Sequence, residues 1–207
     1  MSATARGATR IERDHYPTPD WCVRALCRHI DATVGPPETI LEPCCGEGAI
    51  LRVMTSWWPA AKAHGVEIDT GRARVARSAG FDVENENILS WRHNRPLYSL
   101  VATNPPFEAD ILPRIAEASR GFGRVASLLL PLSWMLGSNE RIEFRRRHPF
   151  DILTFGRRPQ FVRHVVCKEC KWDAWYPIAA TDWPRACPVC ESKTEARSSD
   201  SAEYGWA

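Results

Sequence analysis

The sequence contains no apolar run that approaches the roughly 20 residues of a membrane-spanning helix. Its first 15 residues, which are polar and rich in arginine, also lack the apolar core of a secretory signal peptide. On these grounds we expect neither a membrane-spanning helix nor a secretory signal peptide. We therefore expect a cytoplasmic protein.

The sequence also lacks a large excess of charge of either sign, because the formal net charge is only +2 at pH 7. So small a value does not indicate nucleic-acid binding by itself, and the positions of the basic residues matter more than their number. Apolar residues make up 44% of the chain and charged residues 25%, which excludes a wholly disordered chain. The 207 residues suffice for one main domain with a small appendage.

Short apolar runs alternate with helix-like stretches from Thr39 onward, which predicts an α/β domain with parallel strands and crossover helices. The expected strands are 39–42, 63–68, 81–84, 98–103, 124–130 and 150–155, and the expected helices lie near 48–57, 70–79, 108–119 and 138–147. An earlier helix is expected to begin at Pro19, with Thr18 as its cap. Its predicted apolar face comprises Trp21, Ala25, Leu26, His29 and Ile30.

The amino-acid composition changes after Phe161, where Cys, Trp, Pro and Lys are frequent and neither helical nor strand periodicity is found. We expect a flexible arm at 1–15, a main domain at 16–163, a small module at 164–195 and a tail at 196–207. The tail contains Tyr204-Gly205-Trp206, a candidate for a last strand of the main sheet.

Four of the eight cysteines form two Cys-x-x-Cys pairs, Cys167 with Cys170 and Cys187 with Cys190, separated by 16 residues. This spacing is typical of zinc ribbons, in which four thiolates close a tetrahedral site. We predict a structural Zn²⁺ here, and four free thiols or a redox pair are the alternative. The aromatic and basic residues nearby either contact DNA or bury the metal turns against the main domain.

A glycine turn, Gly46-Glu47-Gly48, follows the apolar strand that contains Glu42. Glycine lets the backbone approach a ligand closely, and ligands bind beyond the carboxyl ends of parallel strands. Glu67 ends the next strand, where a carboxylate can accept hydrogen bonds from both hydroxyls of a ribose. The pattern favours a nucleoside cofactor, and the alternative is that these residues only shape a tight turn.

The tetrapeptide Asn104-Pro105-Pro106-Phe107 follows the strand expected at 98–103. Its prolines fix the backbone, so the Asn104 side-chain oxygen and the Pro105 carbonyl can both accept hydrogens from one amine, while Phe107 offers a flat face. An adenine amine is a poor nucleophile and needs such acceptors, together with close positioning against a methyl donor. The alternative is a turn that merely ends a strand.

Together, the glycine turn, Glu67 and the tetrapeptide resemble the class I S-adenosylmethionine-dependent methyltransferases, and the tetrapeptide resembles the fourth motif of amino-methyltransferases. The resemblance implies a Rossmann-like sheet with helices on both faces, S-adenosylmethionine as cofactor, and catalytic roles for Asn104, Pro105, Pro106 and Phe107. Where the family usually has an aspartate near the cofactor adenine, Asn87 is the best match. The cofactor-binding residues implied are Tyr16, Thr18, Pro19, Glu42, Pro43, Cys44, Gly46, Gly48, Glu67, Ile68, Asn87, Ile88 and Asn104.

The segments 14–19, 141–150 and 157–161 resemble phage and bacterial DNA adenine methyltransferases, and the resemblance covers most of residues 12–163. It implies methylation of the N6 amine of an adenine flipped out of DNA, and a terminal hairpin into which the cysteine module is inserted. RNA adenine methylation and a noncatalytic nucleic-acid-binding protein are the alternatives, and a monomer is favoured over an oligomer. The predicted DNA contacts are Arg141, Arg145, Arg157 and Arg158, which otherwise form a solvated surface.

Overall fold

The computed structural model describes residues 17–92, 96–135, 139–155, 159, 162–171, 173–177, 185–198 and 204–206. Tyr16, Arg157 and Arg158, which the sequence analysis named, lie outside these residues. The side chains of Arg141 and Arg145 also lie outside the described part, although their backbone belongs to a helix.

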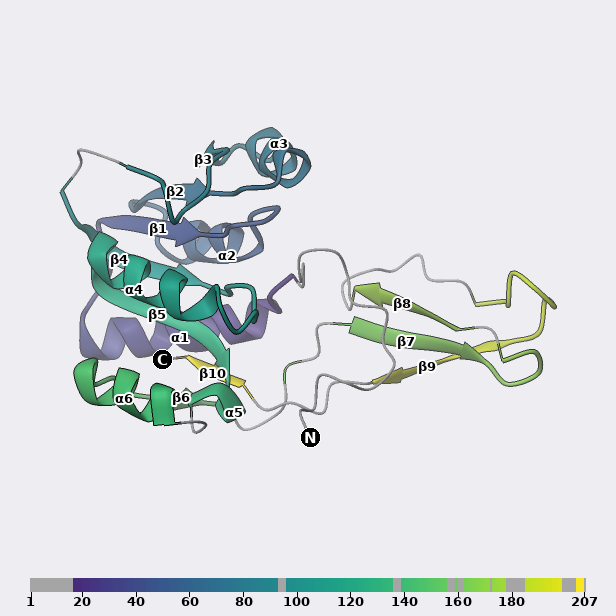
Figure 1. Ribbon diagram of the computed structural model, residues 1–207. Helices are drawn as coiled ribbons and strands as arrows, with labels where there is room; N and C mark the ends of the chain where they lie inside the picture. Colours follow the sequence, from purple (N-terminus) through teal and green to yellow (C-terminus); the bar gives the residue numbers. More distant parts are fainter. Residues whose placement is uncertain are drawn as a thin grey trace.

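Strands and helices alternate along the first part of the chain, as the sequence predicts (Figure 1). The helices are α1 (Asp20–Thr33), α2 (Ala49–Trp57), α3 (Thr70–Ser78), α4 (Leu112–Phe122), α5 (Leu132–Met135) and α6 (Asn139–Arg147). The strands of the main domain are β1 (Thr39–Pro43), β2 (Lys62–Val66), β3 (Asp82–Glu84), β4 (Tyr98–Thr103), β5 (Gly123–Pro131), β6 (Leu153–Thr154) and β10 (Tyr204–Trp206). None of the helices in the described part of the chain combines the length and apolar character needed to cross a bilayer.

These strands form one seven-stranded sheet among the described residues, in the order β3-β2-β1-β4-β5-β10-β6. The pairs β1–β2, β1–β4, β2–β3 and β4–β5 are parallel. The last strand, β10, is antiparallel to both β5 and β6 and lies between them. The parallel α/β fold is therefore confirmed, and the chain returns to its first sheet for the final strand.

Both faces of the sheet are covered, so its central strands are apolar at consecutive positions. Leu129 packs with α1 and α2 in one cluster, whereas its neighbours Leu128 and Leu130 pack with α4 on the opposite face. Ile40 and Leu41 divide between the two faces in the same way. The alternation follows from the two-residue period of a strand.

Helix α1 differs from its prediction in start and in face. It begins at Asp20, Pro19 occupies the N-cap position, and no side chain caps it, so the predicted capping role of Thr18 is wrong. The predicted face is also wrong at His29, which is exposed. The buried residues are Cys22, Val23, Leu26, Cys27 and Ile30. This stripe meets Trp206, whose indole nitrogen donates to the carbonyl oxygen of Cys22 at 3.0 Å.

The region after Phe161 contains strands, although the sequence predicts no strand periodicity there. We call residues 162–198 the cysteine arm, in which β7 (Val162–Cys167) lies between β8 (Asp173–Pro177) and β9 (Thr194–Ser198). Both pairings are antiparallel. In Figure 1 this small sheet is drawn to one side of the seven-stranded sheet. Apolar periodicity in the sequence does not reveal these strands, because they are short and are joined through turns that carry the cysteine pairs.

Candidate active site

A cavity of about 520 Å³ opens at the carboxyl ends of β1, β2, β3 and β4. This is the edge at which parallel α/β sheets bind ligands. The predicted site residues that line it are Thr18, Glu42, Cys44, Gly46, Gly48, Glu67, Ile68, Asn87, Ile88, Asn104 and Pro106. Residues from five segments of the chain therefore meet at one place.

Four other predicted site residues in the described part, Pro19, Pro43, Pro105 and Phe107, are not among the residues that line the cavity. Pro43 is the last residue of β1, and its carbonyl oxygen accepts a hydrogen bond from the Thr103 hydroxyl. Phe107 packs against the apolar cluster under α4. Pro43 and Phe107 thus contact other parts of the main domain, next to residues that line the cavity.

The glycine turn has a left-handed backbone at three positions, with φ of 64° at Cys44, 55° at Gly46 and 86° at Gly48. Glycine adopts such angles at little cost, whereas other residues seldom do. Gly48 is required for a second reason, because a Cβ there would lie 2.7 Å from Cδ2 of Phe81. The turn is fixed to β2 by the Cys45 amide, which donates to the Val66 carbonyl at 3.0 Å.

Two buried carboxylates line the cavity beside this turn. Glu42 is 2% exposed, and its Oε2 accepts from the Leu51 amide at 3.0 Å. Glu67 is 4% exposed, and its two oxygens accept from the Gly46 amide at 2.7 Å and the Asp69 amide at 2.8 Å. Glu67 therefore joins the end of β2 to the glycine turn. Burial, with the neighbouring Glu67 adding to it, raises the pKa of the Glu42 carboxyl well above its usual range.

The asparagines after β3 have different tasks. Asn87 is exposed at the cavity, and its side-chain oxygen accepts from the Leu89 amide at 3.0 Å. Asn85 instead donates from Nδ2 to the carbonyls of Glu67 at 2.8 Å and Ile68 at 3.1 Å. Asn85 is not among the residues predicted from the sequence, although its position directly after a strand is a usable signal.

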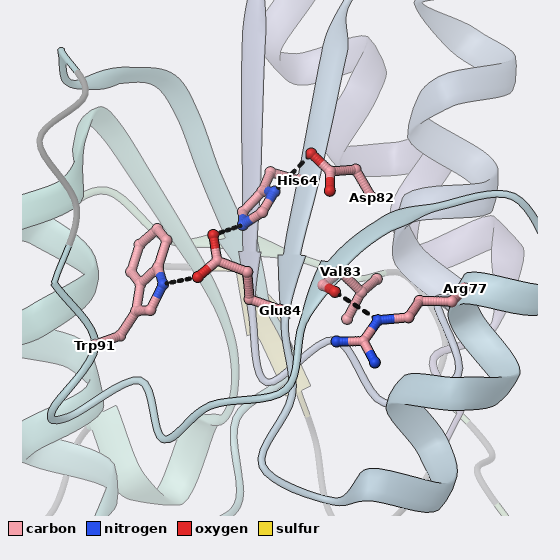
Figure 2. Close-up of polar contacts among 6 residues, drawn as sticks. All are labelled: His64, Arg77, Asp82, Val83, Glu84 and Trp91. Atoms are coloured by element: carbon pink, nitrogen blue, oxygen red, sulfur yellow. Dashed lines mark hydrogen bonds and ion pairs between the residues drawn. The ribbon is translucent and has the colours of Figure 1, made fainter.

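A polar cluster beneath the cavity fixes the segment that carries these asparagines (Figure 2). His64 is buried between two carboxylates, with Nδ1 at 3.0 Å from Asp82 and Nε2 at 3.2 Å from Glu84. The Trp91 indole donates to Glu84 at 2.8 Å and its ring stacks on His64. Glu84 and Trp91 bracket the cavity-lining residues 86–89, so this cluster holds both ends of that segment.

Asn104 enters the cavity directly after β4, the central strand. Its predecessor Thr103 is fully buried and donates to the Pro43 carbonyl, which ties the end of β4 to the end of β1. The Asn104 side-chain oxygen is shielded from solvent. Asn104 thus lines the same cavity as Glu42 and Glu67.

The cysteine arm brings its four cysteines together, with all four Sγ atoms within 4.8 Å of one another. The Sγ atoms of Cys167 and Cys190 are 3.5 Å apart, as are those of Cys170 and Cys187. A disulfide would bring sulfurs to about 2.05 Å, whereas tetrahedral Zn–S bonds of about 2.3 Å separate them by about 3.8 Å. The separations fit the four ligands of one tetrahedral metal ion better than a disulfide-bonded pair.

The two cysteine turns share a backbone feature that favours metal binding. Lys171 and Glu191, each directly after the second cysteine of a pair, have φ of 65° and 61°. The Val189 amide donates to the Cys187 sulfur at 3.4 Å. Hydrogen bonds from Ser192 lower the pKa of Cys190 to about 6, which favours the thiolate that binds metal.

Helix α6 contains the predicted DNA-contacting residues Arg141 and Arg145. Within the described side chains, Arg146 and Arg147 are exposed, and Arg146 lies 3.5 Å from Glu143. The helix packs through Phe144, which contacts Trp134 edge to face. The exposed guanidinium groups of this helix fit both a solvated surface and a contact with a polyanion.

Residues 3–129 match the sequence profile of an uncharacterised methyltransferase family, DUF6094. The chain belongs to this family. The matched range ends inside β5, so the cysteine arm of this methyltransferase lies beyond it.

One relative is a modification methylase, CviBIII, of Paramecium bursaria Chlorella virus NC1A, which is 30% identical over 76 residues. The match covers 35% of this chain and 20% of that enzyme, so the methyltransferase spans about a fifth of its viral relative.

Solved structures confirm the class I methyltransferase fold. A Pyrococcus horikoshii protein, provisionally identified as an RNA methyltransferase, superposes with a TM-score of 0.59 at 14% identity, covering 97% of this chain and 91% of the other. The plantazolicin methyltransferase BpumL, solved with a pentazolic desmethylPZN analogue and SAH, gives a TM-score of 0.51 at 14% identity over 64% of this chain and 66% of its own.

Proposed function

We propose that this methyltransferase uses S-adenosylmethionine to methylate the exocyclic N6 amine of adenine in DNA. The observation that carries the proposal is that Asn104, Glu42 and Glu67 line one cavity at the carboxyl edge of the sheet. Membership of a methyltransferase family supports the type of reaction.

The charge of the cavity supports the choice of cofactor. S-adenosylmethionine carries a positive sulfonium centre, which makes its methyl group electrophilic. The cavity offers that cation two buried carboxylates, Glu42 and Glu67. The glycine turn brings backbone close to the ligand, and exposed Ile68 supplies an apolar surface for an adenine ring. The described residues therefore fit this cofactor.

The chemistry at Asn104 supports an amine as the acceptor. Its side-chain oxygen and the Pro105 carbonyl would accept the two hydrogens of the amine and stabilise the positive charge that develops on nitrogen during attack. Such acceptors are strongest where water is excluded, as it would be once a base fills this part of the cavity. Phe107 would support the base, and no covalent nucleophile is needed.

The printed name of the viral relative, a modification methylase, supports DNA as the polymer. RNA is the second candidate, favoured by the provisional identification of the Pyrococcus horikoshii protein. Incubating the protein with labelled S-adenosylmethionine and matched DNA and RNA duplexes separates the two, and nucleoside analysis identifies the methylated base. We expect label in DNA as N6-methyladenine, whereas label confined to RNA, or to cytosine, would refute the proposal.

We also propose that the cysteine arm binds one structural Zn²⁺ through Cys167, Cys170, Cys187 and Cys190. The proposal rests on the four sulfur atoms that lie close together and on the left-handed residue that follows each cysteine pair. Four thiolates complete a tetrahedral shell and leave no open position for chemistry. Elemental analysis of the purified protein should give one zinc per chain, and a metal-free arm that keeps its fold would contradict this assignment.

A further inference from the structure

The cavity contains two buried acids without a matching cation. Among the described residues, no ion pair joins Glu42 or Glu67 to a lysine, arginine or histidine. Arg52, which also lines the cavity, is engaged with Asp20 on the exposed side of α2. Burying a charge without a partner is unfavourable, and two like charges in one cavity are more so. The empty site is therefore short of positive charge.

Hydrogen bonding distinguishes the two acids. Glu67 accepts a backbone amide at each of its two oxygens, an arrangement that suits a carboxylate anion. Glu42 accepts from the Leu51 amide at Oε2, so Oε1 is the atom that can carry a proton. Burial and the nearby Glu67 raise the pKa of Glu42, so the neutral acid is favoured at this position in the empty site.

Other ionisable groups also face the cavity and set its field. They come from the turn after β1, from α2 and α3, from the segment after β3 and from the turn before α4. These groups are Cys44, Cys45, Glu47, Arg52, Arg72, Glu86 and Glu108. Burial raises the pKa values of both thiols, so they stay neutral, and the acids outnumber the arginines.

We propose that Glu42 makes the cavity selective for the charge of the cofactor. Its carboxyl group loses a proton when the cationic methyl donor binds, and it takes up a proton after methyl transfer, when the demethylated product carries no net charge. The inference rests on the proposed function, because it requires S-adenosylmethionine as the ligand. On binding, the O–H bond at Glu42 breaks and the proton passes to solvent. No other bond changes.

Charge selectivity has a direct consequence for turnover. Methyl transfer converts the sulfonium into an uncharged thioether, S-adenosylhomocysteine. The ionised Glu42 then faces a ligand with one positive charge fewer and lies beside Glu67 in a buried site, which weakens the retention of product. Reprotonation of Glu42 restores the empty state. The site thus binds the substrate form of the cofactor in preference to the product form.

Calorimetry of the full zinc-loaded chain tests this inference directly. S-adenosylmethionine and S-adenosylhomocysteine are titrated separately across pH, in buffers of different ionisation enthalpy, so that released protons are counted. Binding of the donor should release up to about one proton, and its affinity should rise by up to about tenfold per pH unit below the pKa of Glu42 in the empty site. Product affinity should change much less over the same range.

The variants Glu42→Gln and Glu38→Gln complete the experiment. Glu42→Gln keeps the shape of the side chain and an oxygen for the Leu51 amide, and it should remove the proton release and reduce the preference for donor over product. Glu38→Gln removes an exposed charge just before the opposite end of β1 and should behave as the unaltered chain. Should both ligands bind with parallel pH dependence, or should Glu42→Gln still release protons, the selectivity role is wrong. Failure of both ligands to bind would overturn the proposed function itself.

Discussion

The seven-stranded sheet and the cysteine arm are stabilised in different ways. The sheet buries four apolar clusters between its two faces and the helices. In the arm, the buried side chains within the described residues are Cys167, Cys187 and Thr194, two of which belong to the sulfur cluster. A unit of this size commonly depends on a metal or another cross-link to fold. The comparison teaches that the sheet should tolerate loss of metal, whereas the arm should not.

The largest expected effect separates the two units through a metal ligand. Cys187→Ser replaces a buried thiolate donor, so metal affinity should fall by several orders of magnitude and the arm should unfold. Zinc content and circular dichroism of the chain measure the change. Cys27→Ala is the matched control, because burial raises the pKa of the Cys27 thiol to about 12 and this residue lies on the buried side of α1. Loss of zinc in Cys27→Ala as well would show that zinc binding does not depend on the arm alone.

A comparable effect on activity is expected at the edge of the sheet. Asn104→Ala removes the proposed acceptor, so kcat should fall by about 10² to 10³ while binding of the cofactor changes little. Single-turnover kinetics and calorimetry measure the two quantities separately. Zinc content should be unaltered, since the residue lies in the other unit. A variant with normal turnover would remove Asn104 from the mechanism.

A smaller effect is expected where the chain returns from the arm to the sheet. Trp206 is 2% exposed and packs against α1, so Trp206→Ala should lower the free energy of unfolding by about 3 to 5 kcal/mol. Trp206→Phe keeps an aromatic ring, although a smaller one, and loses the donor to Cys22, so it should lower the free energy of unfolding by less than Trp206→Ala does. Chemical denaturation compares the two variants. Equal stability of Trp206→Ala and the unaltered chain would mean that β10 is not part of the folded sheet.

The sheet is also the part that the sequence predicts best. The boundaries of β4 agree with the prediction because its buried residues are consecutive and the prolines after Thr103 end the strand. The prediction of the α1 face is wrong at His29, because the buried side of this helix is set by its tertiary partners, which include Trp206 from the far end of the chain. A local pattern carries no information on such a distant partner.

The candidate site shows the same division between local and distant information. Glu42 lies near the end of β1, Gly48 lies in the turn that follows it and Asn104 comes directly after β4, so their place at the cavity can be inferred from a local pattern. Asn85 was missed because its role depends on carbonyls 17 and 18 residues earlier in the chain. The strands of the arm were missed because their pairing depends on turns that hold the cysteines rather than on alternating apolar residues.

The position of β10 between β5 and β6 also changes the entropy of closing the sheet. Without the arm, a loop of roughly 50 residues would have to close between β6 and β10, whereas pairing of Arg163 with Ser198 leaves roughly 15 to be ordered. The logarithmic dependence of closure entropy on loop length makes this shortening worth about 1 kcal/mol. A folded arm therefore shortens the loop that must close and brings the last strand close to its place in the sheet.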